Sequence, residues 1–211
     1  MEKYIKQLLI PILWEGLFIV SCVFLPKEYF IYTNFLFYFG IIIFFVQKGY
    51  FNLKELKANI TSGKKFWFPV ALTVLFLILA FIVSYVPKMF FPNLDEGMIG
   101  LERNNWLTLI LFAISTIIFP PLAEELFYRK AMISFQSKKI LFISTIISML
   151  LYALEHSLSL YGISMAMIWA IPFSISYIKT KNIYIPMTAH FIVNLIMNGS
   201  SVIITALHFL R

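Results

Sequence analysis

Three short polar motifs interrupt the apolar second half of the sequence and carry residue types that can activate water. The first holds Glu124, Glu125 and Arg129, the second Tyr152 and His156, and the third His190 and Asn194. A carboxylate can take a proton from water, a histidine can bind a metal or move a proton, and an amide can donate to an oxyanion. Together these groups have the chemistry needed to hydrolyse an acyl bond.

Helical spacing indicates which of these side chains share a face. Glu125 and Arg129 are four residues apart, as are His190 and Asn194, so each pair lies on one face of a helix. Glu124 points about 100° away from Glu125 and is free to face another group. The first motif therefore offers one carboxylate for pairing with arginine and one for chemistry.

Each motif also has a plain structural explanation. A Glu–Arg pair can mark a helix end at the headgroups, a lone His is often a packed core residue, and an Asn can join helices in lipid. The sequence contains no HExxH and no GxSxG, which argues against a zincin and against a serine hydrolase with a nucleophile elbow. Its single cysteine, Cys22, permits no cysteine-based metal cluster. Only the combination of the three motifs favours hydrolysis.

The elements that must position these residues are membrane-spanning helices. Of the 211 residues, 61% are hydrophobic and 13% are charged, whereas soluble domains have about 25% charged residues. Apolar runs of 18 or more residues match the ~30 Å hydrocarbon core of a bilayer. We predict an all-α fold, a polytopic transmembrane helix bundle with about seven spans. They run over residues 8–25, 29–46, 67–86, 106–122, 140–154, 161–178 and 183–209.

The basic residues predict how the bundle is oriented. Thirteen of the 17 Lys and Arg fall on one side of it: Lys3, Lys6, Lys48, Lys54, Lys57, Lys64, Lys65, Arg129, Lys130, Lys138, Lys139, Lys179 and Lys181. Cytoplasmic loops are enriched in Lys and Arg, so we expect a cytoplasmic N-terminus and a C-terminus outside. Topology therefore explains the net charge of +7, and we expect no nucleic-acid partner.

The three motifs resemble those of the CAAX-protease and bacteriocin-processing family of membrane endopeptidases. Glu124-Glu125-x-x-x-Arg129 is similar to its EExxxR motif, Tyr152-x-x-x-His156 to its FxxxH motif, and His190-x-x-x-Asn194 to its HxxxN motif. The resemblance covers about residues 106–197, and Tyr152 departs from the usual Phe. We therefore divide the chain into N-terminal transmembrane helices without an assigned motif (residues 1–105) and catalytic helices (residues 106–211).

The resemblance implies an all-helical membrane bundle with a polar chamber and a role for each motif residue. Glu124 would activate water, and His156 and His190 would belong to the catalytic or metal-binding set. Asn194 would stabilise the oxyanion, and Glu125 would complete the catalytic set.

The resemblance also implies supporting residues and leaves the metal open. Arg129 and Tyr152 would be structural support. Zinc, held by Glu124, His156 and His190, is one alternative, and hydrolysis by glutamate without a metal is the other.

The depth of the motif residues sets a condition on this site. His156 lies ~24 Å along its predicted span, whereas Glu124 comes just after the predicted end of span four. The two can meet only if span four continues past Arg129, or if span five is tilted in a deep chamber. Pro120 and Pro121, which lack backbone donors, could break the helix there.

The function we predict is that of an intramembrane endopeptidase, which cleaves a membrane-associated protein or peptide precursor near the cytoplasmic face. The substrate would be a bacteriocin, a pheromone or a CAAX-like protein, and the lipid bilayer is the other partner. The small size and the Phe-, Ile- and Lys-rich composition suit a multi-pass protein of a bacterial plasma membrane, which favours peptide processing or self-immunity.

Two alternatives remain open at this stage. One is a non-catalytic immunity or scaffold protein that binds a bacteriocin or a sensor kinase. The other is a small transporter or channel subunit, against which the sequence lacks paired broken segments in two halves.

Overall fold

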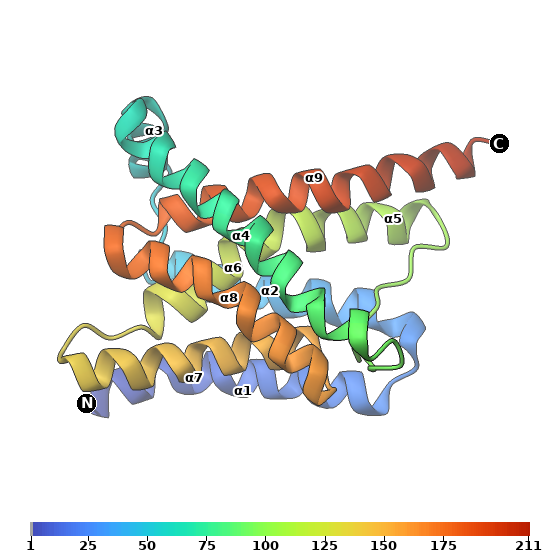
Figure 1. Cartoon of the computed structure of the whole chain (residues 1–211), viewed down its shortest axis with the longest axis horizontal. Helices are drawn as coiled ribbons and strands as arrows, with labels where there is room; N and C mark the ends of the chain where they lie inside the picture. The colour runs from blue at the N-terminus through green and yellow to red at the C-terminus, as the bar shows by residue number, and fades with distance from the viewer. Residues whose placement is uncertain (1) are drawn as a thin grey trace.

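The chain folds into a bundle of long helices that run back and forth between two ends (Figure 1). The structure is a computed structural model that describes residues 2–211, with side chains from residue 8 onward. The side chains of Lys3 and Lys6, used in the topology prediction, lie outside the described residues. The chain is 81% helical, and no strand occurs in the part that the structure describes. The predicted all-α fold is confirmed.

Helices account for the predicted spans. Their bounds are α1 (Glu2–Phe24), α2 (Phe30–Gln47), α3 (Leu53–Thr61), α4 (Lys64–Phe90), α5 (Trp106–Ala113), α6 (Phe119–Glu124), α7 (Lys138–His156), α8 (Leu160–Thr180) and α9 (Tyr184–Phe209), with a 3-10 turn η1 (Lys27–Tyr29) and two π-helical segments, η2 (Ile114–Ile118) and η3 (Glu125–Ala131). Among the described residues, six helical stretches are long and apolar enough to cross a membrane, and Leu8–Phe24 is a shorter apolar helix. The sequence did not predict α3, a short helix with no buried residue.

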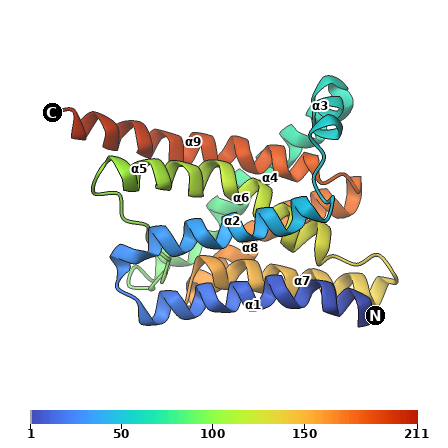
Figure 2. The same ribbon diagram turned by 180° about the vertical axis from the view of Figure 1, so that it is seen from behind.

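The connections alternate between the two ends of the bundle (Figures 1 and 2). The N-terminus, α3, the η3–α7 connection and the α8–α9 turn lie at one end, while the C-terminus and the α4–α5 connection lie at the other. We call the first the basic end, because the connections with the predicted cytoplasmic lysines gather there, and the second the outer end. The six candidate spans and the shorter apolar helix Leu8–Phe24 fit this alternation. By the positive-inside rule we expect the basic end in the cytoplasm.

Span four is longer than the sequence suggested. α5, η2, α6 and η3 follow one another without a break over Trp106–Ala131, a stretch of 26 residues. The predicted span stopped before Glu124 and Glu125 because these residues are charged, whereas the structure buries both side chains and that of Arg129. The condition that span four continues past Arg129 is therefore met.

A cap and a side chain from α9 support the irregular course of span four. Asn105 Oδ1 accepts a hydrogen bond from Thr108 N at 2.9 Å, and Thr108 Oγ1 accepts one from Asn105 N at 3.1 Å. Pro120 has no N–H to donate to the carbonyl of Thr116, four residues earlier. Asn198 of α9 donates to that carbonyl at 3.1 Å, so a neighbouring helix satisfies the group that the proline leaves free.

The connection between α4 and α5 is fastened to the turn between α7 and α8. We call this segment, residues 91–105, the outer connection. Ile99 N donates to the carbonyl of His156 at 3.0 Å, and Ser157 Oγ donates to the carbonyl of Glu96 at 2.7 Å. These bonds hold the outer connection directly against the end of α7, which carries one of the motif histidines.

Gly162→Ala should loosen this attachment. A Cβ at Gly162, near the start of α8, would overlap with the carbonyl of Glu96 and the side chain of Ser157. Overpacking costs about 1–3 kcal/mol, so we expect a lower Tm for the purified protein in detergent. Gly199→Ala is the matched control, because the nearest side-chain atom would lie 3.6 Å from its Cβ. Equal Tm values for the two variants would contradict the close packing.

Candidate active site

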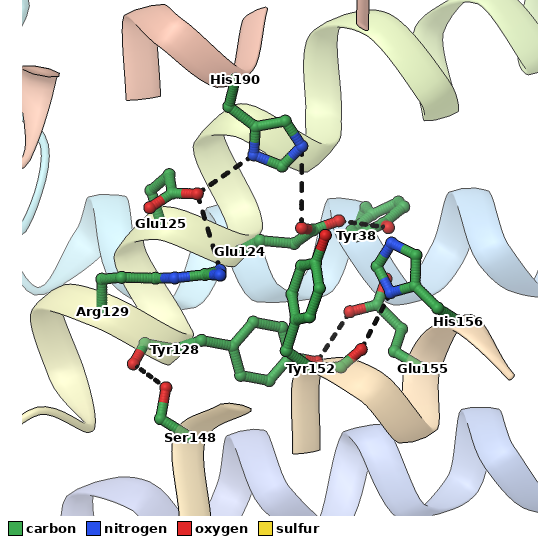
Figure 3. A network of polar contacts seen from close by, with 10 residues as sticks. All are labelled: Tyr38, Glu124, Glu125, Tyr128, Arg129, Ser148, Tyr152, Glu155, His156 and His190. Carbon is green, nitrogen blue, oxygen red and sulfur yellow. Dashed lines mark hydrogen bonds and ion pairs between the residues drawn. The ribbon is translucent and has the colours of Figure 1, made fainter. Parts of the chain in front are cut away.

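The three motifs converge on one cavity inside the bundle. Its volume is about 330 Å³, and Glu124, His156, His190 and Asn194 line it. These residues come from α6, α7 and α9, and Figure 3 shows the carboxylate and the two imidazoles in one polar network. The structure thus brings the motif residues together, while their chemical roles stay predictions.

Glu124 is the carboxylate that faces the cavity. Its side chain is 1% exposed, and its Oε1 accepts a hydrogen bond from the Tyr38 hydroxyl of α2 at 2.7 Å. Its Oε2 has no hydrogen-bond partner among the described residues and lies 3.8 Å from His190 Nε2. Because 3.8 Å is too long for a direct hydrogen bond, both atoms can still bind a third group. One oxygen of Glu124 is held, and the other is free to react.

His190 is oriented by the second glutamate of the first motif. Its Nδ1 lies 3.1 Å from Glu125 Oε1. An ionised carboxylate only accepts hydrogen bonds, so we assign the proton of the neutral ring to Nδ1. Nε2 then presents its lone pair toward Glu124 (Figure 3). Glu125 does not line the cavity itself, and its part in the catalytic set stays a prediction.

Arg129 balances the charge of Glu125. Its Nη1 lies 3.5 Å from Glu125 Oε1, and both side chains are fully buried. The guanidinium carbon lies 4.6 Å from the ring centroid of Tyr152 and 5.0 Å from that of Phe173. The assignment of Arg129 to a cytoplasmic loop was therefore wrong, because the ion pair and the aromatic rings allow it to be buried inside the bundle. The role of Tyr152 as structural support stays a prediction, and its ring contacts Arg129.

His156 reaches the cavity from the outer end of α7. Its Nδ1 lies 2.8 Å from the backbone carbonyl of Tyr152, which can only accept, so Nδ1 carries the proton and Nε2 is an acceptor. The two rings also pack together, with centroids 4.3 Å apart. Asn194 is half-buried and lies one turn after His190 on the cavity wall. Two acceptor nitrogens and one amide side chain therefore line the same cavity as Glu124.

The sequence analysis missed a second group of polar side chains beside the motifs. The Tyr128 hydroxyl lies 2.7 Å from Glu155 Oε2 and 3.2 Å from Glu15 Oε1. All three residues are buried, and Glu155 also lines the cavity. Glu15, an acid within the first apolar run, thus contacts a tyrosine. An acid within an apolar run was the available signal, but Tyr38 and Tyr128 gave none, because aromatic residues in such runs usually pack.

The geometry does not fit a zinc ion held by Glu124, His156 and His190. No group of three or more His, Cys, Asp or Glu side chains in the described part of the chain is placed to hold a metal ion. Glu124 lies 3.8 Å from Nε2 of His190, whereas Glu125 contacts Nδ1 of the same ring. Zinc stays a prediction from the resemblance, and we derive no chemical step through it.

Comparison with known proteins agrees with the motifs. Residues 105–196 match the family model described as type II CAAX prenyl endopeptidase Rce1-like. This segment is therefore similar to that family. The matched residues include all three motifs, so the resemblance stated from the sequence is confirmed. No curated protein and no solved structure matches the chain. At the level of the family, the match supports a CAAX-type intramembrane endopeptidase, and the apolar helices support a multi-pass membrane protein.

Replacing the buried arginine should destabilise the protein strongly. Arg129→Gln leaves Glu125 without its countercharge, and breaking a buried ion pair costs about 3–5 kcal/mol. We expect a large drop in the Tm of the purified protein, measured in detergent. Lys139→Gln, at an exposed position of α7, should leave the Tm unchanged.

The double variant Glu125→Gln/Arg129→Gln tests the cause. It leaves no uncompensated charge at the pair and should recover much of the lost stability. A double variant no more stable than Arg129→Gln would mean that Arg129 supports the fold through its aromatic contacts instead.

Proposed function

We propose that the protein is an intramembrane endopeptidase in which Glu124 activates water to attack a peptide bond. The observation that carries this proposal is the buried Glu124 Oε2, free of hydrogen bonds among the described residues and 3.8 Å from His190 Nε2 at the cavity wall. A water that bridges these two acceptors donates one hydrogen to each and turns a lone pair toward the cavity. That is the orientation required of a nucleophile.

Hydrolysis then proceeds with the groups around the cavity. As the water oxygen bonds to the carbonyl carbon, its proton passes to Glu124 and the carbonyl oxygen becomes an oxyanion. The side-chain amide of Asn194 donates to this oxyanion. The C–N bond then breaks, and the Glu124 carboxyl returns the proton to the leaving amine. The products are a carboxylic acid, which then loses its remaining proton to water, and a free amine, with Glu124 ionised again.

The neighbouring residues keep these groups in the reactive arrangement. Tyr38 holds Oε1 of Glu124, so that Oε2 is the reacting oxygen. Glu125 holds Nδ1 of His190 and thereby keeps Nε2 free of a proton. His156, with its Nε2 lone pair, can accept a hydrogen bond from an N–H of the bound peptide.

We further propose that the substrate is a peptide or protein precursor in a bacterial plasma membrane, such as a bacteriocin or pheromone precursor. A cavity of about 330 Å³ is too small for a folded domain and suits a short extended segment. Its lining combines aromatic and aliphatic side chains with a few polar groups, as ligand sites usually do.

Glu124→Gln tests the reaction. Glutamine keeps the size of the side chain and an oxygen for Tyr38, but it cannot take a proton from water. We expect cleavage of a candidate precursor peptide, followed by mass spectrometry in reconstituted vesicles, to slow about 10²–10⁴-fold. Glu102→Gln, at an exposed acid of the outer connection, is the matched control and should cleave at the wild-type rate.

Each outcome of this assay has a definite meaning. Equal cleavage by wild type and Glu124→Gln would contradict the role of Glu124. A folded wild-type protein that binds the precursor without cleaving it would favour the immunity or scaffold function.

The zinc content of the purified protein tests whether the site lacks three side chains that can bind a metal ion. We expect less than one zinc per chain and cleavage that persists after treatment with a chelator, because Glu124 and Glu125 contact different ring nitrogens of His190 and no group of three metal-binding side chains forms among the described residues. One zinc per chain, lost in His190→Ala together with activity, would show that the site rearranges into a metal centre.

A further inference from the structure

The cavity is walled by elements of the outer end. Met98, Ile99 and Leu101 of the outer connection line it, together with Phe81 and Tyr85 near the end of α4. The outer connection is held there by the hydrogen bonds to the α7–α8 turn described above. Starting from Glu124, the cavity therefore extends toward the outer end of the bundle.

The bundle is closed in the other direction. η3 leads from Glu124 toward the basic end, and its side chains are tightly packed. Leu126, Phe127, Tyr128 and Arg129 are each no more than 1% exposed. This layer separates the reactive carboxylate from the loops at the basic end.

We place the mouth of the cavity between α4 and α9, where two of its lining residues are exposed. These helices pack together, and Figure 1 shows α4 crossing close to the beginning of α9 and then diverging from it toward the outer end. One residue of the cavity wall on each of these two helices is highly exposed. Tyr85 of α4 is 44% exposed, and Met197 of α9 is 53% exposed. A segment of extended chain can enter between them.

The distribution of charged residues between the two ends of the bundle indicates which side of the membrane the mouth faces. Lysines gather in the connections at the basic end, whereas the outer connection contains the acids Asp95, Glu96 and Glu102. By the positive-inside rule the basic end is cytoplasmic. The mouth then faces the outer half of the bilayer and the water beyond it.

We propose that the active site takes polypeptide segments from the non-cytoplasmic side of the membrane, through the mouth between α4 and α9. This inference rests on the proposed function and narrows its substrate class to exported peptides and to the outer flanks of membrane-inserted chains. A prenylated tail held at the cytoplasmic face cannot reach Glu124 by this route. The sequence alone favoured cleavage near the cytoplasmic face, because Glu124 stood at the predicted end of span four.

Single cysteines in a Cys22→Ala background test the route. Met197→Cys places a thiol at the mouth. Ile196→Cys is its matched control at the same depth, because Ile196 is 65% exposed but does not line the cavity. Glu102→Cys and Gln136→Cys report the outer connection and the basic end. Each variant, checked for folding by size-exclusion chromatography, is treated with a charged, membrane-impermeant maleimide in intact bacterial cells and in inverted vesicles.

We expect the maleimide to label Met197→Cys and Glu102→Cys in intact cells, and Gln136→Cys only in inverted vesicles. Ile196→Cys should remain unlabelled in both, because a charged reagent does not enter lipid. Labelling of Met197→Cys only in inverted vesicles, in both preparations, or in neither would overturn the proposed route. Reversed labelling of Glu102→Cys and Gln136→Cys would overturn the orientation. Because labelling measures access and not hydrolysis, these outcomes are independent of whether Glu124 cleaves peptides.

Discussion

The ion pair between Glu125 and Arg129 lies inside a bundle that spans a membrane, where water cannot solvate either charge. Such charges are costly unless they are paired. Glu125 meets this constraint twice, since it contacts Arg129 at 3.5 Å and His190 Nδ1 at 3.1 Å through the same oxygen. The pair that makes burial of the first motif tolerable therefore also fixes the tautomer of the histidine beside Glu124.

The course of span four follows from the same constraint. The π-helical segments η2 and η3 flank α6, and such segments occur often at functional sites. Pro120 leaves the carbonyl of Thr116 free, and Asn198 of α9 donates to it. Irregular backbone is tolerated at this depth because protein, and not lipid, surrounds it. The same packing of α6 and η3 against α9 thus supports the irregular backbone of span four and forms part of the cavity wall.

The site is not confined to the half of the chain that carries the motifs. Tyr38 of α2 donates to Glu124, and Glu15 of α1 contacts Tyr128, which in turn contacts Glu155. Helices without a motif therefore determine which oxygen of Glu124 remains free. The family match over residues 105–196 covers the motif residues, while the first hundred residues complete their surroundings.

The sequence by itself determined the helical class, nearly all of the membrane spans and the identity of the motif residues. Apolar run length, lysine distribution and four-residue spacing are local properties that need no knowledge of packing. Only the tertiary structure decided that span four continues through Glu124 to Ala131 and that the side chain of Arg129 is buried inside the bundle. It also decided that Tyr38 of α2 donates a hydrogen bond to Glu124. These depend on contacts between residues far apart in the chain, because a charge or a proline is tolerated within a span only when another helix pairs with it.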